Sequence, residues 1–99
     1  MLNQVVLVGN IIGEPTKCYD INNKEFTNVR ISVNRQYKNE FGEYERDIFN
    51  IKLSGIIAEN TIEYCKNGDV IGVKGKLESN GDRIEIIAEK ITFLKSDRG

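Results

Sequence analysis

Residues 44–68 read YERDIFNIKLSGIIAENTIEYCKNG, and the period of the apolar positions changes part-way along this stretch. Apolar and polar residues alternate up to Ser54, which predicts a strand with one buried face. The inward row is Phe49, Ile51 and Leu53, and the outward row is Ile48, Asn50, Lys52 and Ser54. Gly55 then ends the strand, and residues 56–66 carry apolar side chains at helical spacing. Asn67 and Gly68 supply a left-handed stop, so the stretch predicts a strand followed by a short helix.

Strand patterns dominate the rest of the chain. An apolar run at 5–8 ends at Gly9, and residues 26–34 alternate, with Val29, Ile31 and Val33 on the inward side. A polar connection, 36–42, joins this second strand to the third. After the helix, two more strands are expected at 70–77 and 83–94, and Asn80-Gly81 between them is a strong hairpin signal.

Three strands, a helix and two further strands predict an all-β fold. The order is that of a five-stranded OB-fold Greek-key barrel with one short helix between strands 3 and 4. An SH3-like barrel would not need this helix, and a ferredoxin-like fold would need two. Because 99 residues leave no length for a second core, we expect a single OB-fold domain over 1–99.

Composition excludes several classes of protein. Lys+Arg 14 against Asp+Glu 15 gives a net charge of -1, which excludes a broadly basic, phosphate-coating protein but not a local basic groove. The absence of His removes Ser-His and Cys-His nucleophilic sites and the commonest zinc ligands. Cys18 and Cys65 form no C-x-x-C pair and are expected to be reduced thiols. With no signal-peptide pattern and no apolar run near the roughly 18 residues of a membrane span, we expect a soluble, cytoplasmic protein that does not bind membranes.

Enzymatic interpretations find little support. Gly68, Gly72 and Gly75 do not match the spacing of a phosphate-binding loop, and their expected role is close packing of a barrel strand. The acidic residues Glu43 and Asp47, with Glu45 between them, lack the glycine-bent loop of a calcium site, so a solvated strand edge is expected. We therefore expect no enzymatic activity, no metal and no cofactor.

The connection around Gly42 is the best candidate for binding. It carries three aromatic residues with cations interleaved: Tyr37, Phe41, Tyr44, Arg35, Lys38 and Arg46. Aromatic rings stack on unpaired bases, at about 1–3 kcal/mol each, and cations hold the phosphates between them. The outward row of the third strand extends this surface with Lys52, and Arg30 is expected beside it. Alternatively, the aromatic residues fold back onto their own barrel or onto a partner subunit. Phe26, Tyr64 and Phe93 are expected in the core or at its edge.

Four blocks of the sequence resemble bacterial and phage single-stranded DNA-binding proteins. They are LNQVVLVGN (2–10), FTNVRISVNR (26–35) leading to Tyr37, AEN (58–60) and YCKNGDVIGVKGKL (64–77). The resemblance runs from residue 1 to about residue 94. It implies an OB-fold subunit that assembles into homodimers or homotetramers and wraps single strands without sequence preference. It also implies a stacking role for Tyr37, which stands where the family has a Trp, and DNA-facing positions at or beside Asn10, Arg35 and Lys52.

Departures from the family pattern weaken the expected binding. Ile48 and Ser54 occupy positions where the family carries stacking aromatics, and the chain has no Trp. The hairpin at Asn80-Gly81 is short, and the chain stops at 97–99 without the family's acidic tail, which argues against a full housekeeping role. A short form of this kind is also similar to primosomal replication protein N.

The sequence therefore predicts an accessory single-stranded DNA-binding protein that serves replication, recombination or repair. The alternatives are a primosome component similar to primosomal replication protein N and an OB-fold protein-interaction module with weak or no DNA binding. Residues 3–8 are apolar on both faces, more than one barrel buries, so a second copy is expected to cover them. The expected partners are single-stranded DNA, further copies of the chain, and replication or primosome proteins.

Overall fold

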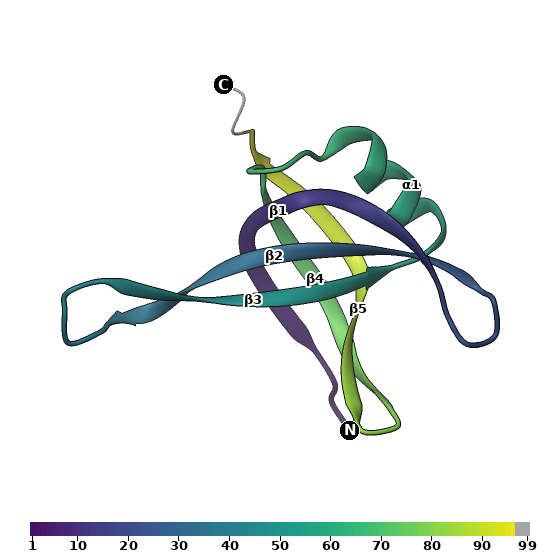
Figure 1. Cartoon of the computed structure of the whole chain (residues 1–99), viewed down its shortest axis with the longest axis horizontal. Helices are drawn as coiled ribbons and strands as arrows, with labels where there is room; N and C mark the ends of the chain where they lie inside the picture. The colour runs from purple at the N-terminus through teal and green to yellow at the C-terminus, as the bar shows by residue number, and fades with distance from the viewer. Residues whose placement is uncertain (97–99) are drawn as a thin grey trace.

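Five strands and one helix make up the computed structural model, which describes residues 1–96. They are β1 (Val5–Tyr19), β2 (Glu25–Lys38), β3 (Tyr44–Leu53), α1 (Gly55–Tyr64), β4 (Val70–Asn80) and β5 (Arg83–Lys95). The strands close into one barrel in the order β1-β2-β3-β5-β4 (Figure 1). Only β3 and β5 pair in parallel; the other pairs are antiparallel. The predicted five-stranded OB barrel with one helix between strands 3 and 4 is confirmed. The expectation about the family's tail concerns residues 97–99, which lie outside the described residues.

The first strand is much longer than the sequence predicted. Its first half pairs with β4, from Val5↔Gly75 to Asn10↔Val70, and its second half pairs with β2. Gly9 lies just before this change of partner, where a Cβ atom would overlap the backbone carbonyl oxygen of Ser32. The prediction that the strand ends at Gly9 is therefore wrong. The glycine permits a close approach between strands instead.

The inward rows predicted for the second and third strands form the core. Val29, Ile31, Ile51 and Leu53 are fully buried, and Phe49 packs against them half-buried. Two core residues come from β4 and one from β1: Ile71, Val73 and Ile11. Because alternate side chains of a strand share one face, the outward row on β3 faces away from this core.

Helix α1 closes one end of this core and is shorter than predicted. It buries Ala58 and Thr61, and the Thr61 hydroxyl donates to the Ile57 carbonyl at 2.8 Å. The helix ends at Tyr64 rather than at residue 66, because Cys65 is already extended. Gly68 (φ 89°) belongs to a separate tight turn and is not the helix stop that the sequence predicted.

Several apolar side chains expected to be buried are exposed in the single chain. Val6 and Val8 on β1 are 66% and 53% exposed, so one barrel leaves the outer face of this strand uncovered; burial of that face by a second copy stays a prediction. Tyr64 and Phe93 are exposed as well, whereas Phe26 is half-buried at the edge of the barrel. Within residues 1–96, no helix has the length and apolar character needed to cross a membrane.

Candidate nucleic-acid interface

The hairpin that joins β2 to β3 extends well beyond the barrel (Figure 1), and we call residues 34–47 the arm. The sequence builds the end of this arm around Asn39. Its side-chain oxygen accepts hydrogen bonds from the backbone N–H groups of Phe41 and Glu43, at 2.9 and 3.0 Å. Gly42 takes the positive φ of 78° that this turn requires. The strands run further than predicted, since β2 continues to Lys38 and shortens the connection.

The aromatic residues of the arm point into solvent. Tyr37 is 80% exposed and Phe41 77% exposed, so neither folds back onto its own barrel. Lys38 pairs with Tyr44 across the two strands, and its ammonium lies 5.6 Å from the centre of the Tyr44 ring. Tyr37 lies in the stretch 35–37, where the regular pairing of β2 with β3 is interrupted, whereas Lys38 is paired. The predicted cluster thus includes an irregular part of the β2–β3 ladder.

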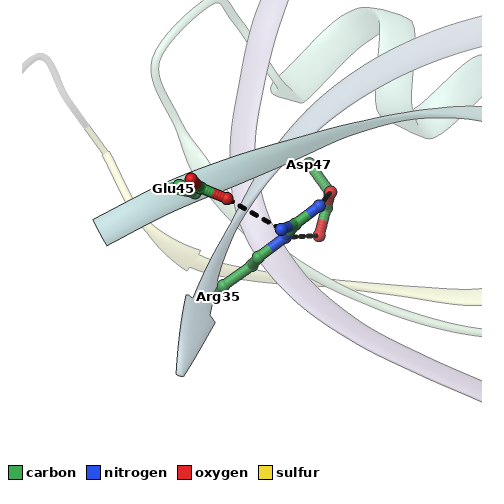
Figure 2. A network of polar contacts seen from close by, with 3 residues as sticks. All are labelled: Arg35, Glu45 and Asp47. Carbon is green, nitrogen blue, oxygen red and sulfur yellow. Dashed lines mark hydrogen bonds and ion pairs between the residues drawn. The ribbon is translucent and has the colours of Figure 1, made fainter. Parts of the chain in front are cut away.

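Arg35 is held by two carboxylates of β3. Its Nε and Nη2 atoms donate to Asp47, and its Nη1 donates to Glu45 Oε2 at 2.8 Å (Figure 2). The hydrogen bond and the charge of Asp47, followed by the charge of Glu45, raise the pKa of the guanidinium. The hydrogen bond from Arg35 in turn lowers the pKa of Asp47. The positive charge of Arg35 is therefore already balanced within the arm.

The arm as a whole is not basic. It carries the three predicted cations, Arg35, Lys38 and Arg46, against four carboxylates, Glu40, Glu43, Glu45 and Asp47. With Arg35 paired, Lys38 and Arg46 are the cations left to attract a phosphate. Arg46 lies beside Asn34 and is exposed.

On the barrel, the outward row of β3 meets polar residues of β2. Arg30 pairs with Asn50, and Asn28 pairs with Lys52. The Asn28 amide donates to Asn50 Oδ1 at 3.2 Å, and Arg30 is exposed beside this contact. The structure therefore brings Arg30 and Lys52 onto one polar surface, as predicted from strand alternation.

Lys52 lies in a groove between the β1–β2 and β4–β5 hairpins. The groove has a volume of about 370 Å³, and its lining residues are Phe26, Asn28, Asn50, Lys52, Arg83, Ile84, Glu85 and Ile86. The Lys52 ammonium lies 4.4 Å from the centre of the Phe26 ring and 3.8 Å from Glu85 Oε1. Its side chain is only 22% exposed, because it is packed between these two residues. Tyr19 and Ile21 line the adjoining part of the groove.

Asn10 lies away from both the arm and the groove. It is exposed on β1, and its amide donates to the Gly68 carbonyl at 3.0 Å. Its strand neighbour is Ser32, which in turn pairs with Ile48. Asn10 is thus placed beside one of the two positions where this sequence lacks an aromatic ring.

Metal chemistry has no candidate in the part of the chain that the structure describes. No three His, Cys, Asp or Glu side chains gather there in a way that could hold an ion. The three acidic residues at the start of β3 do not form a common site either, because Glu45 and Asp47 face Arg35 while Glu43 belongs to the turn.

Comparison with known sequences identifies the family of this chain. The model of the single-strand binding protein family matches residues 2–94. The chain belongs to this family.

Single-stranded DNA-binding protein B of Bacillus subtilis (strain 168) is 34% identical, and the match covers 95% of this chain and 91% of that protein. Single-stranded DNA-binding protein A of the same strain is also 34% identical, but the chain covers only 63% of its length. The single-stranded DNA-binding protein of Halalkalibacterium halodurans is 36% identical, and the match covers 96% of this chain and 62% of that protein. The chain thus spans less than two thirds of these longer relatives.

Solved structures of single-stranded DNA-binding proteins share the fold. The mitochondrial protein from S. cerevisiae superposes with a TM-score of 0.79 at 18% identity, covering 96% of both chains. The small protein from Streptomyces coelicolor gives 0.73 at 20% identity, covering 95% of this chain and 96% of that one. At these identities the likeness concerns the barrel alone.

In this single-strand binding protein family member, sequence reasoning missed the groove. The sequence pattern predicts Phe26 in the core or at its edge and assigns no binding role to Arg83. Both lie where OB folds use the face of strands 2 and 3 together with the β1–β2 and β4–β5 loops. The hairpin signal at Asn80, combined with the OB strand order, is enough to place Arg83 at this face. Which residues contact Lys52 depends on the parallel β3–β5 register, Ile51↔Ile86 and Lys52↔Ile87, which the sequence does not reveal.

Proposed function

We propose that this chain binds single-stranded DNA without sequence preference, as a homo-oligomer with an accessory role in replication, recombination or repair. The observation that carries the proposal is the near full-length match to the B. subtilis protein whose name describes this activity. The arrangement of polar, cationic and aromatic groups supports it. The groove at Lys52 lies on the face that OB folds use for oligonucleotides.

The strand would run from the groove along the outward row of β3 toward the arm. Lys52 and Arg83 supply positive charge at one end, and Arg30, Lys38 and Arg46 supply it further along. Tyr37 and Phe41 offer accessible rings for stacking, which works with every base because each has a π-face. Because stacking accepts every base, the binding is expected to tolerate any sequence.

Fluorescence anisotropy of a labelled oligo-dT strand, titrated at several salt concentrations, tests the proposal. Phosphate contacts predict that log affinity falls with log salt by about 0.7 for each phosphate neutralised on a single strand. A duplex of the same length is the control and should bind much more weakly, because its bases cannot stack on Tyr37 or Phe41. Absence of binding to oligo-dT at low salt would contradict the proposal.

A second copy of the chain is the proposed cover for β1. Val6 and Val8 project outward from this strand, and a partner that removes them from water gains about 25 cal/mol per Å² of apolar surface. Sedimentation that detects only monomer at micromolar concentration would contradict self-association. We further propose a cytoplasmic protein without enzymatic activity or cofactor, whose other partners are replication or primosome proteins.

The alternative function is a protein-interaction module, or a primosome component, in which DNA binding is weak. Two observations favour it: four carboxylates outnumber three cations in the arm, and Ile48, just beyond the arm on β3, presents no ring. A pull-down that recovers a defined protein partner, from material free of nucleic acid by its absorbance at 260 and 280 nm, would support this alternative. Copurifying single-stranded nucleic acid would contradict it.

A further inference from the structure

The two strands of the arm lose their regular pairing next to Tyr37. Asn34 pairs with Arg46 and Lys38 pairs with Tyr44, so three residues of β2 lie opposite one residue of β3. The ladder is therefore interrupted along 35–37. Backbone pairing alone therefore does not fix the conformation of the arm where it carries the exposed ring of Tyr37.

Arg35 spans the interruption with its side chain. Nε donates to Asp47 Oδ2 and Oδ1 at 3.1 and 3.3 Å, Nη2 donates to Oδ1 at 2.9 Å, and Nη1 donates to Glu45 Oε2 at 2.8 Å. All three guanidinium nitrogens are thus engaged, with carboxylates two residues apart on β3 (Figure 2). A planar fork makes such a double contact, whereas a lysine ammonium acts as a single point charge.

We propose that Arg35 is a positioning residue, which clamps β2 to β3 across the irregular register and so presents Tyr37 for stacking. This inference rests on the proposed binding of single-stranded DNA. An arm fixed before binding loses less conformational freedom when a base stacks on it, and the affinity rises accordingly. In this view Glu45 and Asp47 are part of the binding device although they carry the same sign of charge as the phosphates.

A direct phosphate contact by Arg35 is the competing role, and it makes opposite predictions. Asp47→Asn removes a negative charge and releases the guanidinium. A phosphate-binding Arg35 would then bind more tightly and with a salt slope steeper by about 0.7. A clamping Arg35 would lose its bidentate partner, and binding would weaken.

Glu43→Gln is the matched control for the charge change. Glu43 lies in the same arm, and its carboxylate enters none of the ion pairs between residues 1–96. The variant therefore reports the general gain from removing one negative charge near the phosphates. The effect of the clamp is the difference between Asp47→Asn and Glu43→Gln.

Arg35→Lys keeps the positive charge but removes the planar guanidinium that contacts two carboxylates. We expect it to lower oligo-dT affinity about fivefold or more, approaching the loss of one stacked base, with the salt slope unchanged. If residue 35 only contacted a phosphate, the lysine variant would keep both the affinity and the salt slope. Unchanged affinity in Arg35→Lys, or tighter binding by Asp47→Asn than by Glu43→Gln, would overturn the proposal.

Amide hydrogen exchange of the free protein tests the clamp without DNA. Arg35→Lys should accelerate exchange in the arm while the barrel strands stay protected, and unchanged exchange in the arm would contradict the clamp. The two proposals then fail in different ways. If the wild-type chain does not bind oligo-dT, the proposed function fails. If it binds and Arg35→Lys binds equally well, only the clamp fails.

Discussion

Tyr37 and Lys52 differ in the kind of contact that each can offer to a strand. The Tyr37 ring is accessible, whereas the Lys52 ammonium is packed over Phe26 beside Glu85. We expect Tyr37→Ala to cost about 1–3 kcal/mol of oligo-dT affinity without changing the salt slope, because stacking involves no counterion release. Anisotropy titrations over a salt series measure both quantities. Tyr64→Ala is the matched control, since Tyr64 is an exposed tyrosine on α1, away from the proposed path. An equal loss in the two variants would contradict the role of Tyr37.

Lys52→Met should show the complementary behaviour. Methionine keeps the apolar packing against Phe26 and removes the charge, so we expect the salt slope to fall by about 0.7, the contribution of one phosphate on a single strand. The same titrations measure this change. If Lys52 served only the ion pair with Glu85, the slope would stay the same.

At the scale of elements, β1 requires a glycine at position 9, whereas β4 has room for a side chain at position 72. A Cβ atom at Gly9 would overlap the Ser32 carbonyl oxygen, whereas one at Gly72 would lie at an ordinary 3.7 Å from Leu94 Cδ1. We expect Gly9→Ala to destabilise the fold by about 1–3 kcal/mol or more, since two paired strands must separate. Gly72→Ala should be neutral or stabilising by up to about 1 kcal/mol, because it restricts the unfolded chain. Urea unfolding measures both, and similar midpoints for the two variants would contradict the packing argument.

The arm should also respond to acid. Arg35 lowers the pKa of Asp47 by its hydrogen bond. A carboxyl group whose pKa is lowered in the folded protein stabilises the fold when the pH is above its ordinary pKa, about 4. This stabilisation is lost as the pH falls through the lowered pKa. In an NMR titration of side-chain carboxyl groups we expect Asp47 to titrate below the ordinary aspartate range, and Arg35→Met to return it there. An Asp47 titration that is the same in both proteins would contradict the contact.

The same elements show what could be predicted from sequence. Alternation in residues 26–34 and 44–54 placed the inward rows correctly, because a buried face leaves a strong period of two. The length of β1 was missed because Gly9 was interpreted as a strand end, when it permits a close approach. The partners of Arg35 were missed because they depend on a register shift that no local pattern encodes. The aromatic and cationic pattern around Gly42 indicates Tyr37, whose stacking role stays a prediction. The groove around Phe26 and Arg83 depends on the packing of distant hairpins.

For the whole molecule, the exposed apolar row of β1 predicts self-association. Val6 and Val8 project from the barrel on the strand that pairs with β4, and burying them between copies would remove them from water. In sedimentation velocity at micromolar concentration we expect the wild-type chain to be an oligomer. The double substitution Val6→Glu and Val8→Glu should give a monomer, because like charges would then meet across the interface. The fold should survive, since both positions face solvent within one copy. Ile56→Glu, at an exposed apolar position on α1, is the control and should leave the oligomer intact. If the double variant sediments like the wild-type oligomer, copies associate through another surface, and β1 needs a different explanation for its apolar outer face.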